Sequence, residues 1–71
     1  MTFLEFKHRL LNLSLSQAQL AREIEKRFGE RLAPAELGNI MRGIQSGNKP
    51  ERVKTEVEQI LEELEKEGER V

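Results

Sequence analysis

The chain has 71 residues, which is enough for one small domain over residues 1–71. It contains no Cys and a single histidine, His8, so we expect no disulfide bond, no thiolate chemistry and no metal site. No apolar run reaches the roughly 18–20 residues that span a membrane, and early charges leave no signal-peptide core. We therefore expect a cytoplasmic protein with no membrane partner.

The net charge of −1 hides an asymmetry along the chain. Residues 1–54 contain ten Lys and Arg against six Glu, a net charge of +4. Residues 55–71 contain two Lys and Arg against seven Glu, a net charge of −5. This pattern indicates a basic body followed by an acidic helix, which is either a solvated face or an interaction surface.

The first predicted helix covers residues 3–11. Thr2 and Glu5 form a capping-box pattern at its start. Phe3, Phe6 and Leu10 follow at helical spacing and predict its buried stripe. His8 is expected at the surface.

The second predicted helix has the strongest start signal in the chain. Ser16 and Gln19 form a capping box, with Leu15 and Leu20 as a hydrophobic staple. Gly29 is expected to end the helix. The face predicted to be buried contains Leu20, Ala21, Ile24 and Phe28. The opposite, polar face contains Gln19, Arg22 and Lys26.

The third predicted helix runs from Pro34 to Gly43. Its inward positions are Leu37, Ile40, Met41 and Ile44. Its outward positions are Ala35, Asn39 and Arg42, with Gly38 at their margin. Glycine inside a helix costs about 0.5–1 kcal/mol relative to alanine, so Gly38 indicates either close approach of a partner or a tolerated defect.

The last predicted helix follows a polar loop at residues 45–49 and covers about residues 50–67. Pro50 is expected to start it and Gly68 to end it. A second capping-box pattern at Thr55 and Glu58 would divide the segment in two. Its apolar stripe contains Val53, Val57, Ile60, Leu61 and Leu64. The stripe is expected in the core, although Leu61 and Leu64 could instead contact a second copy of the chain.

These elements predict an all-α fold, a small bundle of four to five helices. The runs LSQAQLAREI and LGNIMRG resemble the Cro and lambda-repressor type of bacterial and phage transcription regulators. The matching positions are Ser16, Gln17, Leu20, Ala21, Ile24, Leu37, Ile40 and Gly43. The resemblance implies a lambda-repressor-like helix-turn-helix over about residues 16–44.

The chain departs from this family at one place. The family usually ends its first motif helix with Gly about four residues after the Ala, where this chain has Glu25. The helix instead continues to Phe28, and the connection is about six residues longer. This resembles a phage-type subset with an extended first motif helix.

The DNA-reading residues are assigned from their chemistry and from this resemblance. Arg pairs with guanine and Asn with adenine through two hydrogen bonds, and small side chains allow close approach. The positions expected to read bases are Ala35, Gly38, Asn39 and Arg42. Phosphate contacts are expected from Gln17, Gln19, Arg22, Lys26, Lys49, Arg52 and Lys54. Each of these polar side chains could also be simply solvated.

The sequence therefore predicts a sequence-specific regulator of phage or mobile-element origin that binds double-stranded DNA as a homodimer. The alternative is a protein-interaction module on the same scaffold, such as an antitoxin or anti-repressor, with its partner on the acidic helix. No nucleophile–base pair or Gly-rich phosphate loop is visible, so we expect no enzyme activity and no cofactor.

Overall fold

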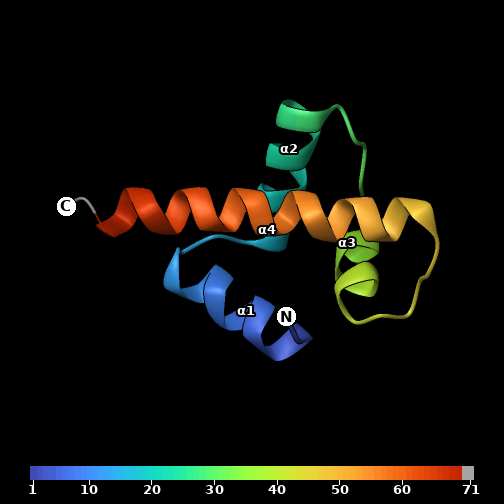
Figure 1. Cartoon of the computed structure of the whole chain (residues 1–71), viewed down its shortest axis with the longest axis horizontal. Coiled ribbons are helices and arrows are strands. Elements are labelled where there is room, and N and C mark those ends of the chain that lie inside the picture. The colour runs from blue at the N-terminus through green and yellow to red at the C-terminus, as the bar shows by residue number, and fades with distance from the viewer. Residues whose placement is uncertain (70–71) are drawn as a thin grey trace.

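The structure, a computed structural model, describes residues 1–69. Its four helices are α1 (Phe3–Asn12), α2 (Gln17–Phe28), α3 (Pro34–Met41) and α4 (Asn48–Glu69) (Figure 1). No strand occurs within this range. The predicted all-α bundle is confirmed, with four helices rather than five.

Helix α4 is the long element against which the others are arranged. It crosses the whole molecule in Figure 1, with α1 below it and α2 above it. Its side chains at 3–4 spacing are fully buried, which places one apolar stripe along the core. These side chains are Val53, Val57, Ile60 and Leu61. The other buried core residues are Phe6, Leu10, Leu20, Ala21, Ile24, Leu37, Ile40 and Met41.

The predicted division of α4 near Thr55 is wrong. The Thr55 hydroxyl donates a hydrogen bond to the Glu51 carbonyl at 3.2 Å, which is the interaction of a threonine inside a helix. Pro50 lies in the first turn rather than at the start, where its missing N–H has no intrahelical partner to lose. Gly68 was expected to end α4 but lies within it.

The start and end of α2 follow the predicted capping pattern. The Gln19 backbone N–H donates to the Ser16 hydroxyl at 3.1 Å, and the Ser16 N–H donates to the Gln19 side-chain oxygen at 2.8 Å. Gly29 adopts φ of +72°, which glycine tolerates without a Cβ clash, and its N–H donates to the Glu25 carbonyl. The predicted extension of α2 to Phe28 is confirmed.

Two side chains predicted to point inward are exposed. Phe28 is 42% exposed because it lies one turn beyond Ile24, the last buried residue of α2. Ile44 is 69% exposed because α3 ends at Met41 and Gly43, at φ of +81°, turns the chain away. Helical spacing therefore no longer predicts the direction of Ile44.

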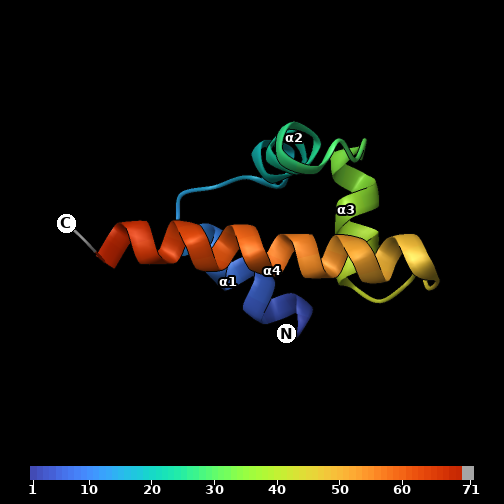
Figure 2. The same ribbon diagram turned by 45° about the horizontal axis from the view of Figure 1, so that its top comes forward.

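Helices α2 and α3 are joined by the link at residues 29–33. Figure 2 shows α2 nearly along its axis while α3 runs in the plane of the picture, so the two cross steeply. Pro34 begins α3 after Ala33, whose side chain cannot cap the first turn. The chain thus presents α3 as a short helix across α2.

Candidate nucleic-acid interface

Helix α3 approaches the beginning of α2 at Gly38. A Cβ atom at Gly38 would lie 2.9 Å from the side-chain oxygen Oε1 of Gln17. Gly38 is buried, so the prediction that it lies on the outward margin and reads bases is wrong. Its missing side chain instead leaves room for the end of the Gln17 side chain, which lies against α3 at this point.

The outward face of α3 is formed by three of the predicted residues. Ala35 and Arg42 are exposed and Asn39 is half-buried. They lie opposite the buried residues Leu37 and Ile40, because residues three, four and seven apart share a face. The structure therefore brings Ala35, Asn39 and Arg42 together on one surface.

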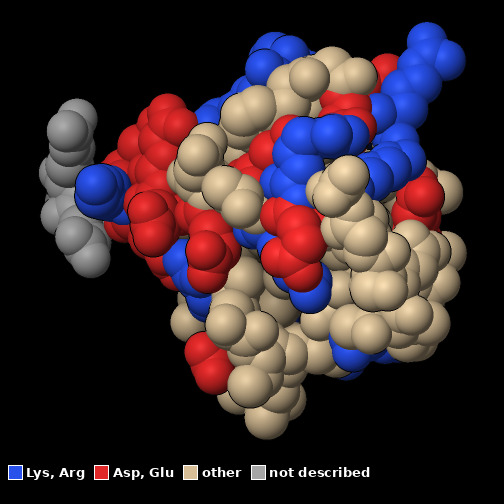
Figure 3. All heavy atoms as spheres, turned by 45° about the vertical axis from the view of Figure 1, so that its right-hand side comes forward, with Lys and Arg blue, Asp and Glu red and all other residues tan. Residues whose placement is uncertain are grey.

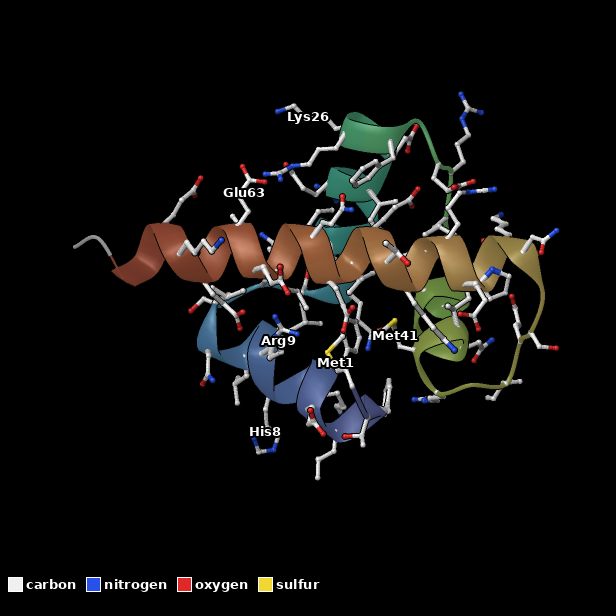
Figure 4. All side chains as sticks on the ribbon, viewed as in Figure 1. Met1, His8, Arg9, Lys26, Met41 and Glu63 are labelled. Atoms are coloured by element: carbon white, nitrogen blue, oxygen red, sulfur yellow. The ribbon has the colours of Figure 1, made fainter. Side chains whose placement is uncertain are left out.

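The outer face of α2 is polar, as predicted. Gln19, Arg22 and Lys26 are all exposed. The Gln19 side-chain oxygen is used in the cap, which leaves its NH₂ group to donate elsewhere. Lys26 points away from the molecule at the far end of α2 (Figure 4), so it lies apart from α3. Neither Arg22 nor Lys26 is in an ion pair within residues 1–69.

The basic residues after α3 are paired with glutamates. Arg52 donates two hydrogen bonds to Glu30, at 2.7 and 2.8 Å, and this guanidinium lowers the pKa of the Glu30 carboxyl. The Lys49 Nζ lies 3.6 Å from a Glu36 oxygen. The Lys54 Nζ lies 3.8 Å from a Glu51 oxygen. Contact of these residues with phosphate would have to compete with these carboxylates, and it remains a prediction.

Phe3 and Lys7 lie beside Arg42 and were not among the site residues predicted from the sequence. The Arg42 guanidinium carbon lies 4.8 Å from the centroid of the Phe3 ring, and the Lys7 Nζ lies 5.7 Å from it. Phe3 and Lys7 are four residues apart, so their contact could have been found from the sequence. The contact with Arg42 depends on how α1 packs against the end of α3. An open groove of about 510 Å³ lies beside this contact, between α1, α3 and α4.

The sequence leaves open a contact of Leu61 and Leu64 with a second copy of the chain. Leu61 is fully buried in the core, so that role is excluded for it in the folded domain. Leu64 is half-buried and packs against the same core. Both belong to the packing of α4 on the bundle.

Two carboxylates of α4 have unusual surroundings. Glu56 is 7% exposed and its Oε2 atom has no hydrogen-bond partner among residues 1–69. Burial raises the pKa of Glu56, as does the nearby Glu30 carboxylate, while Arg52 opposes the shift. Glu65 accepts two hydrogen bonds from Arg9, at 2.6 and 2.9 Å, and these lower its pKa. In Figure 4 Arg9 points from α1 toward α4, whereas His8 points away.

Charge is distributed unevenly over the surface. Figure 3 shows acidic side chains gathered toward the C-terminal end of the chain, whereas basic side chains lie mainly in the upper half of this view, in part among acidic ones. No group of three or more metal-ligating side chains is found in the described part of the chain. No helix among residues 1–69 is long and apolar enough to cross a membrane.

Comparison of the chain with family models, with curated proteins and with solved structures finds no match.

Proposed function

We propose that the protein is a sequence-specific DNA-binding transcriptional regulator that inserts α3 into the major groove. The observation that carries the proposal is the steep crossing of α2 and α3 at Gly38, next to Gln17. This contact leaves the face of Ala35, Asn39 and Arg42 directed outward. A major groove about 12 Å wide admits one helix with such a face.

The side chains of this face suit base reading, Asn39 in particular. Asn39 can donate to and accept from adenine through its amide, and Ala35 can contact a thymine methyl group. The N-termini of helices and polar side chains beside them commonly contact phosphate. Gln17 is the first residue of α2 and lies against α3, so it suits a phosphate contact next to the bases that α3 reads.

The resemblance to Cro and lambda-repressor proteins supports a repressor of phage or mobile-element origin. Such regulators bind two half-sites about one helical turn apart as dimers. We therefore propose a homodimer on DNA. Its contacts would come from surfaces other than Leu61.

The first test measures binding of a mixed-sequence fluorescent duplex at about 50 mM and about 200 mM salt. Several phosphate contacts would lower the affinity steeply over this range. Selection from a randomised duplex library then gives the preferred site. Asn39→Ala is expected to weaken that site by about 1–3 kcal/mol and to relax preference at one base pair. Absence of binding at low salt would rule the proposal out.

A second candidate function is binding of a basic protein partner through the acidic face of α4. The specific observation is that Glu58 and Glu62 are exposed and take part in no ion pair within residues 1–69. In this case the protein would be a protein-interaction module of the antitoxin or anti-repressor type. Two results together would favour this second function. The wild-type protein would not bind DNA, and a Glu58→Gln, Glu62→Gln double variant would no longer capture the basic partner.

A further inference from the structure

We infer that Phe3, Lys7 and Arg42 form a phosphate-binding cluster, so that α1 is part of the DNA-contacting surface. The inference rests on the proposed function and extends it to a helix outside the helix-turn-helix. We name these three residues the Phe3 cluster. The inference assigns Arg42 to contact with DNA phosphates rather than with base edges.

The ring of Phe3 brings two cations from different helices together. Lys7 lies one turn after Phe3 on α1, and Arg42 follows the last residue of α3. Cations within about 6 Å of an aromatic centroid are attracted by the negative face of the ring. The Lys7 and Arg42 contacts, at 5.7 and 4.8 Å, meet this condition. The ring is itself held by Phe6, whose centroid lies 6.1 Å away and whose side chain is fully buried.

Both cations keep their charge available. Neither Lys7 nor Arg42 takes part in an ion pair within residues 1–69, in contrast to Lys49, Arg52 and Lys54. Lys7 is exposed at one end of the cluster and Arg42 at the other. The contact with Phe3 orders the Lys7 and Arg42 side chains. Their N–H groups have no carboxylate acceptor within residues 1–69, so they can donate to a phosphate.

The cluster is continuous with the predicted phosphate contact at the start of α2. Lys7 and Gln17 line the same shallow hollow of about 210 Å³. Gln17 in turn lies against Gly38 of α3. A strip of three helices therefore runs from Gln17 through Lys7 to Arg42. This is the arrangement that a DNA strand bordering the major groove would meet.

The position of Arg42 also favours contact with the DNA backbone over contact with the bases. Residues near the N-terminus of a recognition helix contact base edges, and Arg42 is the C-cap of α3. Glu51 and Glu58 line the groove beside Arg42 on the α4 side, beyond ion-pair distance. These carboxylates direct an anion to the α1 side of the guanidinium, where Lys7 is.

The test compares the salt dependence of duplex binding in Lys7→Gln, Arg42→Gln and Phe3→Leu. Each Gln variant is expected to reduce the slope of log affinity against log salt by about 0.9 and to weaken all sequences alike. Phe3→Leu keeps both charges and is expected to keep the slope, but to weaken binding about two- to tenfold because the freed side chains must be ordered. Lys66→Gln, in the acidic end of α4, is the matched control and should change neither quantity.

A second measurement does not depend on DNA binding. Titration of ¹⁵N-labelled protein with inorganic pyrophosphate should shift the Arg42 Nε–H and Lys7 signals together, and Phe3→Leu should remove the ring-current shift of Arg42. If wild type binds duplex but the Gln variants keep its slope, or if Arg42→Gln changes preference at one base pair, the cluster is not a phosphate site. If wild type does not bind duplex, the proposed function fails, and a missing pyrophosphate response then overturns the cluster as an anion site as well.

Discussion

Gly38 shows how the role of one residue depends on its neighbour. From the sequence, a glycine among outward residues indicated close approach of DNA. In the structure the neighbour is Gln17, a residue of the same chain. Helical spacing placed Gly38 at the edge between two faces, and only the packing of α2 decides which face it serves.

Gly38→Ala separates stability from binding. The atom that a new Cβ would meet is the far end of a flexible side chain, so Gln17 can move aside. We expect stability to be unchanged or raised by up to about 1 kcal/mol, since alanine favours the helix. We expect DNA affinity to fall to that of Gln17→Ala. Urea denaturation and duplex titration check the two halves, and a large loss of stability would show that the backbones clash.

Glu56 is predicted to make stability depend on pH. Its raised pKa means that the unfolded carboxyl ionises before the folded one as pH increases. Its contribution is therefore most favourable below the usual glutamate pKa and declines as pH rises from there through the raised folded value. Glu56→Gln should raise the melting temperature at pH 7 and change it little near pH 4. An equal gain at both values would show that ionisation is not the cause.

The Arg9–Glu65 contact joins α1 to α4 and belongs to the scale of elements. Arg9 lowers the pKa of Glu65, so this pair stabilises the fold above the usual glutamate pKa. That contribution is lost as pH falls through the lowered folded value. Because the Glu65 side chain is 37% exposed, we expect a coupling energy of only about 0.5–1 kcal/mol. A double-mutant cycle with Arg9→Gln and Glu65→Gln at pH 7 and pH 3 measures this coupling energy. A weaker coupling is expected for Arg9 with Glu62, which acts on Arg9 through charge alone, without a hydrogen bond.

The four helices could be predicted from the sequence. Their ends were predictable only where a capping residue or a glycine determines the helix end. The capping box of α2 and Gly29 specify both of its ends by short-range hydrogen bonds, and the structure has them. Thr55 carried the same kind of pattern, yet the continuous apolar stripe of Val53, Val57 and Ile60 keeps α4 intact across it. Burial along one helix outweighs a single possible cap.

At the scale of the whole molecule, the basic residues could be counted from the sequence. The sequence did not show which of them pair with glutamates and which remain available to a ligand. Lys49, Arg52 and Lys54 looked like phosphate contacts because they follow α3. Tertiary folding places Glu30 and Glu36 beside Arg52 and Lys49, and helix spacing places Glu51 beside Lys54. Lys7, in contrast, is not among the predicted phosphate contacts and has no ion pair within the described range. The partners of Lys49 and Arg52 are distant in sequence, so no local pattern encodes that these two charges are paired.

This sorting gives a prediction for the whole surface. Arg52→Gln should lower the melting temperature slightly, since it releases Glu30, while leaving the salt slope of DNA binding unchanged. Arg22→Gln should reduce that slope by about 0.9 if α2 contacts the backbone. Parallel salt titrations of the two variants check both. A reduced slope for Arg52→Gln would show that its pair with Glu30 opens on DNA.

The place of α4 in the chain has a consequence for synthesis. The three earlier helices leave the ribosome before the four α4 residues that complete their core, Val53, Val57, Ile60 and Leu61. Until then Phe6, Leu20 and Ile24 have no apolar surface of α4 to cover them. The core is therefore completed only once α4 has emerged, and a released chain truncated after residue 47 would leave these side chains exposed to proteases and chaperones.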